Sequence, residues 1–177
     1  MSKLYFWALY VCVCVVMSVN INNHRQNVTK PEVKYPAIAE STIELIKSFE
    51  GYRNRPYYDS EGWLTTGVGH LIKHNEPHLV SATLSDDQIH DLLKSDLGHC
   101  EGAIEKSVKV NLTQNQFDAL ASLCFNIGPD RFRLSNVVFL LNKGELTAAA
   151  NAFLQWSRPA SLVRRRQQEK ALFLADL

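Results

Sequence analysis

The chain has 177 residues and a formal net charge of +1, with 46% hydrophobic and 21% charged residues. This length suits one domain with a core of its own, and the composition is that of an ordinary globular protein. A net charge so close to zero gives no strong positive potential to attract nucleic acid, so we expect no nucleic-acid partner. The six histidines show no metal-ligand spacing and no Cys-x-x-Cys pair occurs, so we expect neither a metal nor another cofactor.

The N-terminal stretch from Leu4 to Val19 is almost wholly apolar, and a polar run follows it. It is shorter than the about 20 residues that span a bilayer comfortably, and it lacks the polar face of a core helix. We interpret residues 1–20 as an export or signal-anchor segment and residues 21–38 as a polar tether. Three versions stay open: a removed signal peptide, a permanent anchor, and a weak anchor that later leaves the membrane. All three place the body, residues 39–177, outside the cytoplasm.

The body begins with a helix signal and a short sheet signal. Ser41 opens a capping box, and the helix that follows ends at Gly51, directly after Glu50. The stretch from Tyr57 to His70 is rich in Tyr, Trp, Thr and Gly around an Asp-Ser-Glu-Gly turn. This pattern predicts a hairpin or a three-stranded meander.

Helix signals dominate the rest of the body. Ser85 and Thr113 each open another capping box, and Gly128 with Pro129 ends the second of these helices. Shorter helices are expected over residues 135–142, 146–156 and 161–174. The order predicts an α+β fold, with a small sheet near the start and a larger helical lobe.

Three polar residues near the start of the body suit glycoside hydrolysis. Glu50 ends a helix, Asp59 follows nine residues later in the turn, and Thr65 lies six residues further on. Splitting a glycosidic bond needs a protonated acid on the leaving oxygen and an ionised carboxylate that holds or activates water. A glutamate buried beside Phe49 would keep its proton while a turn aspartate stays ionised, and Thr65 would orient the water. Taken alone, a helix-end glutamate and a turn aspartate are commonplace.

The surrounding motifs resemble those of the phage-type lysozyme (endolysin) family. Residues 49–51, 57–59 and 62–70 carry Phe-Glu-Gly, Tyr-Tyr-Asp and Gly-Trp-Leu-Thr-Thr-Gly-Val-Gly-His. Glu50, Asp59 and Thr65 meet the spacing of the family's catalytic residues. Further similar motifs occur at residues 115–120, 125–128, 148–149, 156 and 162–169. The resemblance covers about residues 40–175, which is nearly the whole body.

This resemblance implies a lysozyme-like fold with an active-site cleft between its two lobes. It implies a muramidase that hydrolyses the β-1,4 bond between N-acetylmuramic acid and N-acetylglucosamine in peptidoglycan, lysing the host cell for phage release. Glu50 would be the general acid, Asp59 the base that positions water, and Thr65 its orienting hydroxyl. The family's reaction is inverting, which requires carboxyl groups about 6.5–9.5 Å apart. We expect the protein to act as a monomer.

Other residues of these motifs have roles that the sequence leaves open. Gly67 either lets the backbone pass close to the sugar or permits a strand bend. His70 either touches the substrate or is a hydrogen-bonded structural histidine, and Asn126 either packs or lines the cleft. One arginine of residues 164–166 is a candidate partner for Glu50, and such a cation would favour the ionised carboxylate.

The N-terminal segment resembles the uncleaved anchors of signal-anchor-release endolysins, although those are richer in Gly and Ala. The resemblance implies tethering to the host inner membrane through residues 4–19 and later release to the periplasm. In such an oxidising compartment Cys100 and Cys124, on neighbouring predicted helices, form either a disulfide or two buried thiols. Cys12 and Cys14 are either small apolar residues of the segment or partners for thiol exchange after release.

Two other functions compete with hydrolysis. A lytic transglycosylase needs one acid-base group and forms an anhydro sugar, but the presence of both Asp59 and Thr65 argues against it. A non-catalytic wall-binding or membrane-tethered protein would not need the Glu50 carboxylate at all. The products of wall digestion separate the first alternative from hydrolysis, and a Glu50 substitution separates the second.

Overall fold

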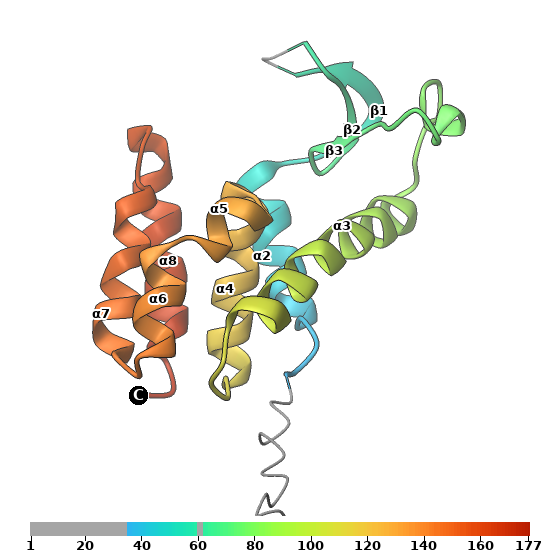
Figure 1. Cartoon of the computed structure of the whole chain (residues 1–177). Helices are drawn as coiled ribbons and strands as arrows, with labels where there is room; N and C mark the ends of the chain where they lie inside the picture. The colour runs from blue at the N-terminus through green and yellow to red at the C-terminus, as the bar shows by residue number, and fades with distance from the viewer. Residues whose placement is uncertain (1–34, 60–61) are drawn as a thin grey trace, which may run out of the picture. The chain divides into compact units, whose positions relative to one another are not determined.

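The computed structural model describes residues 35–59 and 62–177, which form a small sheet and a helical body (Figure 1). The expected anchor over residues 4–19, with Cys12 and Cys14, lies outside the described residues. Within those two ranges, none of the helices is both long and apolar enough to cross a membrane.

Helix α2 (Glu40–Glu50) begins one residue before Ser41, so the capping box expected there is wrong. The N-cap residue is Ala39, which offers no side chain to the free N–H groups of the first turn. Instead, the Ala39 N–H donates at 3.0 Å to the buried carboxylate of Asp118, which belongs to another helix. A tertiary contact that the local pattern does not contain therefore holds the start of α2.

The helical body includes residues before the boundary expected between residues 38 and 39. The Tyr35 hydroxyl donates to the Val108 carbonyl at 2.7 Å, and its ring packs on Phe117 with 6.2 Å between centroids. Ile38 also packs against the core. Residues 35–38, which the sequence pattern assigns to the tether, thus lie on the helical body because they carry apolar surface.

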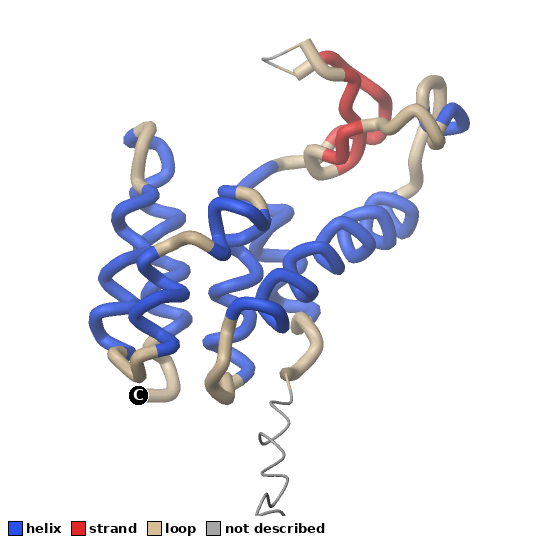
Figure 2. The backbone as a smooth tube through the Cα atoms, in the orientation of Figure 1, coloured by secondary structure: helices blue, strands red, loops and turns tan. Residues whose placement is uncertain are grey.

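Three short antiparallel strands form the sheet in the order β1–β2–β3. They are β1 (Arg53–Tyr58), β2 (Leu64–Gly67) and β3 (His70–Leu71). The predicted meander is confirmed, although β1 starts four residues before Tyr57, which pairs with Thr65 on β2. Figure 2 shows that the strands gather at one end of the described chain and that helices make up nearly everything else.

Two long helices form the frame of the body. Helix α3 (Asp86–Ser107) runs from the sheet into the helical lobe (Figure 1), and most residues of α4 (Gln114–Ile127) are buried. The capping boxes at Ser85 and Thr113 are confirmed. Each hydroxyl accepts from the backbone N–H of a glutamine three residues later, and the side chain of that glutamine accepts from the backbone N–H of the capping residue. Gly128 ends α4 as predicted, with a φ of 87° that suits glycine.

Four shorter helices complete the body around α4. They are α5 (Pro129–Arg133), α6 (Asn136–Asn142), α7 (Leu146–Ala152) and α8 (Val163–Phe173). The predicted helix over 146–156 is divided, since a 3₁₀ turn (Phe153–Trp156) follows α7. The sequence pattern does not predict helix α5. Pro129 stops the preceding helix, and it also fits the first turn of a new one.

A disulfide joins Cys100 of α3 to Cys124 of α4, whose Cα atoms lie 5.7 Å apart. Of the two alternatives for these cysteines, the structure thus has the bonded one. Both are buried, in the same apolar cluster as Ile104, Leu120 and Phe132. The bond fixes α3 against α4 at one wall of the candidate site.

Candidate active site

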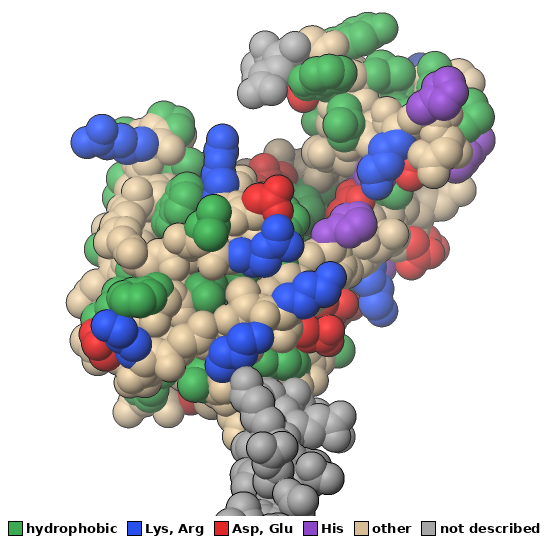
Figure 3. Space-filling model, viewed as in Figure 1, with side chains coloured by type: hydrophobic (Ala, Val, Ile, Leu, Met, Phe, Trp, Pro, Cys, Tyr) green, Lys and Arg blue, Asp and Glu red, His purple; other side chains and the backbone are tan. Residues whose placement is uncertain are grey.

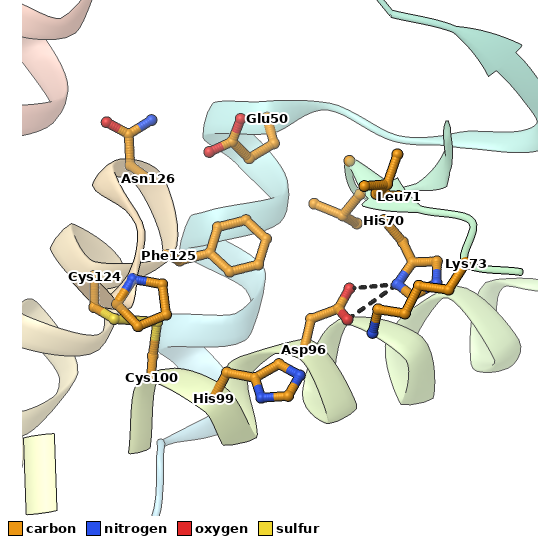
Figure 4. Close-up of a pocket in the computed structure, with 13 residues that line it drawn as sticks. Glu50, His70, Leu71, Lys73, Asp96, His99, Cys100, Cys124, Phe125 and Asn126 are labelled. Atoms are coloured by element: carbon orange, nitrogen blue, oxygen red, sulfur yellow. Dashed lines mark hydrogen bonds and ion pairs between the residues drawn. A yellow bond between two sulfur atoms is a disulfide. The ribbon is translucent and has the colours of Figure 1, made fainter. Parts of the chain in front are cut away.

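A cavity of about 410 Å³ lies between the β2–β3 segment and helices α3 and α4, and Glu50 borders it. In the close-up, Glu50 lies above Phe125, with Asn126 on one side and His70 on the other (Figure 4). The space-filling view shows a hollow between the helical body and the sheet lobe, with charged side chains near it (Figure 3). Gly51 ends α2 with a φ of 67°, and the chain then leaves for β1, so Glu50 stands where the two lobes meet.

Arg165 of α8 is the arginine that faces Glu50. Its Nη1 forms an ion pair with Glu50 Oε1, although the two residues are 115 positions apart in the sequence. The Arg165 guanidinium also lies 4.9 Å from the centroid of the Phe49 ring, within range of a cation–π interaction. Of its neighbours, Arg164 is exposed and Arg166 is fully buried.

The expected burial of Glu50 is wrong. Its side chain is 30% exposed, whereas Asp59 is half-buried. The Phe49 ring lies against the Arg165 guanidinium. A difference in burial therefore does not separate the two carboxylates as the sequence suggested, and the ion pair with Arg165 is the main electrostatic feature at Glu50.

Asp59 lies at the end of β1, where the hairpin turns. Its Oδ1 accepts from the Trp63 N–H at 2.8 Å, and its own N–H donates to the Trp63 carbonyl at 2.9 Å. These contacts hold the two sides of the turn together. Among the described residues, the walls of the two cavities beside Glu50 include neither Asp59 nor Thr65.

Thr65 and Gly67 lie on the buried strand β2. The Thr65 hydroxyl donates to the Trp63 carbonyl at 3.1 Å, which links it to the same turn that Asp59 closes. Gly67 has a φ of 58°, and a Cβ there would lie 3.5 Å from the Leu92 side chain of α3. This positive φ favours glycine at the bend of the strand, whereas the approach of the Gly67 backbone to the sugar stays a prediction.

His70 lies between two carboxylates and is 4% exposed. Its Nδ1 is 2.9 Å from Asp96 Oδ2 and its Nε2 is 3.0 Å from Glu76 Oε2. The hydrogen bond with Asp96 raises the pKa of His70 above its ordinary value, with a further contribution from Glu76 and opposition from burial. The Lys73 N–H lowers the pKa of Glu76. Both ring nitrogens are engaged, so His70 is a structural histidine at the cavity wall that joins β3 to α3.

Asn126 lines both cavities beside Glu50, and its Oδ1 accepts from Arg166 Nη2 at 2.9 Å. It therefore faces these cavities, a buried arginine holds it there, and its contact with substrate stays a prediction. Phe125, from the motif at residues 125–128, also lines the first cavity. No motif marks four further residues of this wall, which are Leu71, Lys73, Asp96 and His99.

Among the described residues, one surface group brings together three side chains of types that bind metals, two glutamates and one histidine. Oxygen atoms of Glu40 and Glu44 and a nitrogen of His90 lie within 4.8 Å of one another. Both glutamates are exposed, and Glu44 already pairs with Lys47 at 2.7 Å. We assign no metal to this group, which lies outside the cavity.

Comparisons with known proteins agree with this two-lobed architecture. The family model for phage lysozyme matches residues 47–169. The chain is 43% identical over 143 residues to the endolysin of Salmonella phage P22, covering 78% of this chain and 98% of that protein. A crystal structure of a P22 lysozyme mutant aligns with a TM-score of 0.72 at 42% identity, covering 78% of this chain and 99% of that one.

A second relative is the SAR-endolysin of Escherichia phage Mu, at 32% identity over 139 residues, which cover 76% of this chain and 79% of that protein. Fold and relatives together define a lysozyme-type glycoside hydrolase that degrades peptidoglycan. The chain belongs to the phage lysozyme family.

We expect substitution of His70 by Asn to destabilise the protein most under mildly acidic conditions. A group whose pKa is raised by folding adds stability that is complete below its unfolded pKa and is lost as pH rises through the folded value. The difference in free energy of unfolding should be about 1.5–3 kcal/mol for these charge-assisted bonds. It should be largest near about pH 5–6 and should shrink toward about pH 8.

Urea unfolding of wild type and His70→Asn across this pH range provides the measurement. His99→Asn is the matched control, because His99 is an exposed histidine on the same cavity wall. A His70 difference that does not change with pH would contradict the prediction.

Proposed function

We propose that the protein is an endolysin that hydrolyses the β-1,4 bond between N-acetylmuramic acid and N-acetylglucosamine, with Glu50 as its general acid. The position of Glu50 carries this proposal: it borders the cavity at the junction of the two lobes, paired with a buried arginine. In the protonated state Glu50 donates its proton to the leaving glycosidic oxygen. The bacterial cell wall is the substrate, and lysis of the host releases phage.

Asp59 and Thr65 complete the proposed machinery on the sheet lobe. Both are tied to Trp63 by hydrogen bonds, so one turn carries the carboxylate and the hydroxyl together. In an inverting reaction Asp59 acts as the base that positions the attacking water, and Thr65 orients that water. Their spacing from Glu50 within the family motif supports these roles, and the contacts at Trp63 give each side chain a fixed place in the turn.

We expect Glu50→Gln to abolish lysis while the protein still folds. Glutamine retains an oxygen that can accept from Arg165 but has no proton of suitable acidity, so turnover should fall by about 10²–10⁴-fold. Mass spectrometry of wall digests measures this loss and identifies the product formed by wild type. Reducing muramyl ends indicate hydrolysis, whereas anhydro ends would indicate a transglycosylase. Full lysis by a folded Glu50→Gln protein would mean a non-catalytic wall protein.

A pair of neighbouring threonines tests the water-orienting hydroxyl. Thr65→Val should lower kcat by about tenfold to a hundredfold, because the water loses an oriented partner. Thr66→Val is the matched control: Thr66 is fully buried on the same strand, and its hydroxyl has no hydrogen-bond partner in the described structure. Steady-state kinetics on purified peptidoglycan compare the two. Equal losses in both variants would show that kcat follows damage to the strand and not the Thr65 hydroxyl.

We further propose that residues 4–19 tether a monomeric enzyme to the host inner membrane before it is released to the periplasm. The apolar character of this segment and the 32% identity of the body to a SAR-endolysin support this arrangement. In this scheme residues 1–20 are the anchor, the following polar residues are the tether, and the lysozyme domain follows. The enzyme reaches the wall only after release.

Collapse of the membrane potential should move the full-length protein from the membrane fraction to the periplasm. A weak anchor of this length is held in part by the potential and lacks the apolar surface of a full span. Fractionation before and after collapse, with N-terminal sequencing of both pools, measures this shift. A protein that begins near Val19 from the outset would instead indicate an ordinary cleaved signal peptide.

A further inference from the structure

A buried carboxylate lies behind the candidate site, between two arginines. Glu169 of α8 is 0% exposed. Its Oε1 accepts from Arg165 Nε at 3.0 Å and from the Ser122 hydroxyl at 2.7 Å. Its Oε2 lies 3.1 Å from Arg166 Nη1, in an ion pair. Glu169 is therefore the anion that both arginines share.

Each of these arginines also reaches a residue of the cavity wall. Arg165 pairs with Glu50 through Nη1 and donates from Nη2 to the Ser122 carbonyl at 3.1 Å. Arg166 donates from Nη2 to Asn126 at 2.9 Å. One carboxylate thus anchors the two cations that hold Glu50 and Asn126.

The cluster is balanced, with two guanidinium groups against the carboxylates of Glu50 and Glu169. Burial raises the pKa of Glu169, which the two arginines and Ser122 oppose, and it lowers the pKa of Arg166 to about 10. Arg166 therefore keeps its charge at neutral pH. Removing one member of such a group leaves an uncompensated charge, which must be met by the members that remain.

We propose that Glu169 is a positioning residue that acts through Arg165 and sets how strongly Arg165 holds the Glu50 carboxylate. The inference rests on the proposed role of Glu50 as general acid. While Glu169 shares the charge of Arg165, Glu50 can regain the proton that it must donate. Without that shared charge, Arg165 and Arg166 together would favour the ionised Glu50 carboxylate, which cannot act as an acid.

Other charged groups also surround Glu50, and the variants below leave them in place. The remaining titratable side chains that line its two cavities are His70, Lys73, Asp96, His99 and Arg164. They form a constant background in a comparison of variants, so differences in the pH profile report the change in the buried cluster.

Two substitutions should move the pH profile in opposite directions. Glu169→Gln removes the shared anion, so the alkaline limb of kcat should shift by about one pH unit to lower pH, with kcat at neutral pH reduced about tenfold. Arg166→Gln removes one cation, so Glu169 interacts with Arg165 alone. Arg165 then stabilises the ionised Glu50 carboxylate less, and the alkaline limb of kcat should shift to higher pH. KM for wall fragments should change by less than about twofold in Glu169→Gln, since that variant adds no group to the cleft.

Ser122→Ala is the control, because it removes a hydrogen bond to Glu169 without changing any charge. Its alkaline limb should shift much less than that of Glu169→Gln even if its melting temperature falls, because both arginines and both carboxylates remain. Purified full-length variants are compared by circular dichroism and by kcat and KM from about pH 4 to 9. If Glu169→Gln does not fold, the direction in which the alkaline limb of Arg166→Gln shifts decides whether the positioning role holds.

The outcomes separate this inference from the proposed function. An inactive Glu50→Gln protein, together with unmoved limbs in Glu169→Gln and Arg166→Gln, would overturn the positioning role and leave Glu50 as the acid. A fully active Glu50→Gln protein would overturn the proposed function itself. Limbs that move in opposite directions support both.

Discussion

The Arg165 guanidinium is the contact on which the site depends, because it joins three helices at one point. It lies on α8, binds the last residue of α2 and donates to a backbone carbonyl of α4. A cation that is 5% exposed is costly unless its donors are matched. Glu50, Glu169 and the Ser122 carbonyl match them. Glu50 supplies one of the three acceptors of the buried Arg165, so the packing of the C-terminal helix positions a carboxylate from the N-terminal part of the body.

Two further links hold the walls of the cavity that Glu50 borders. The Cys100–Cys124 disulfide joins α3 to α4, and His70 joins β3 to α3 through Asp96. These links have different chemistry, one covalent and one electrostatic, and they act on opposite sides of the same cavity (Figure 4). Helix α3 takes part in both, so the long helix that connects the lobes is anchored at each. The relative position of sheet and helical body is thus set by side chains at the site itself.

Local chemistry was predictable from the sequence, whereas tertiary choices were not. The capping boxes at Ser85 and Thr113 occur as expected, since every atom of such a motif lies within four residues. The same motif at Ser41 failed because Asp118, far along the chain, meets the helix start instead. The sequence likewise narrowed the partner of Glu50 to residues 164–166 but could not choose among them. That choice depends on how α8 is rotated against α4.

The exposure of Glu50 is a second case in which packing overrode a local expectation. Phe49 suggested an apolar cover for the carboxylate, but its ring lies against the Arg165 guanidinium. Because 30% of the Glu50 side chain stays accessible, a substrate oxygen can approach it. If Glu50 is to act as an acid, another group must limit how strongly Arg165 favours its ionised form. No single segment of sequence reveals this requirement, because its members come from opposite ends of the domain.

The rotation of α8 also explains why a run of three arginines is not a solvated surface. Glu169 lies four residues after Arg165 and three after Arg166, and Phe173 continues the same buried face. Only Arg164 of the three arginines is exposed. A helix face of charged residues can be buried when its charges cancel within one turn, and here the surplus cation is met by Glu50 from another helix. The near-neutral charge of the whole chain therefore gives no sign of the two buried arginines directly behind the cavity, and the Glu50 carboxylate is part of their neutralisation.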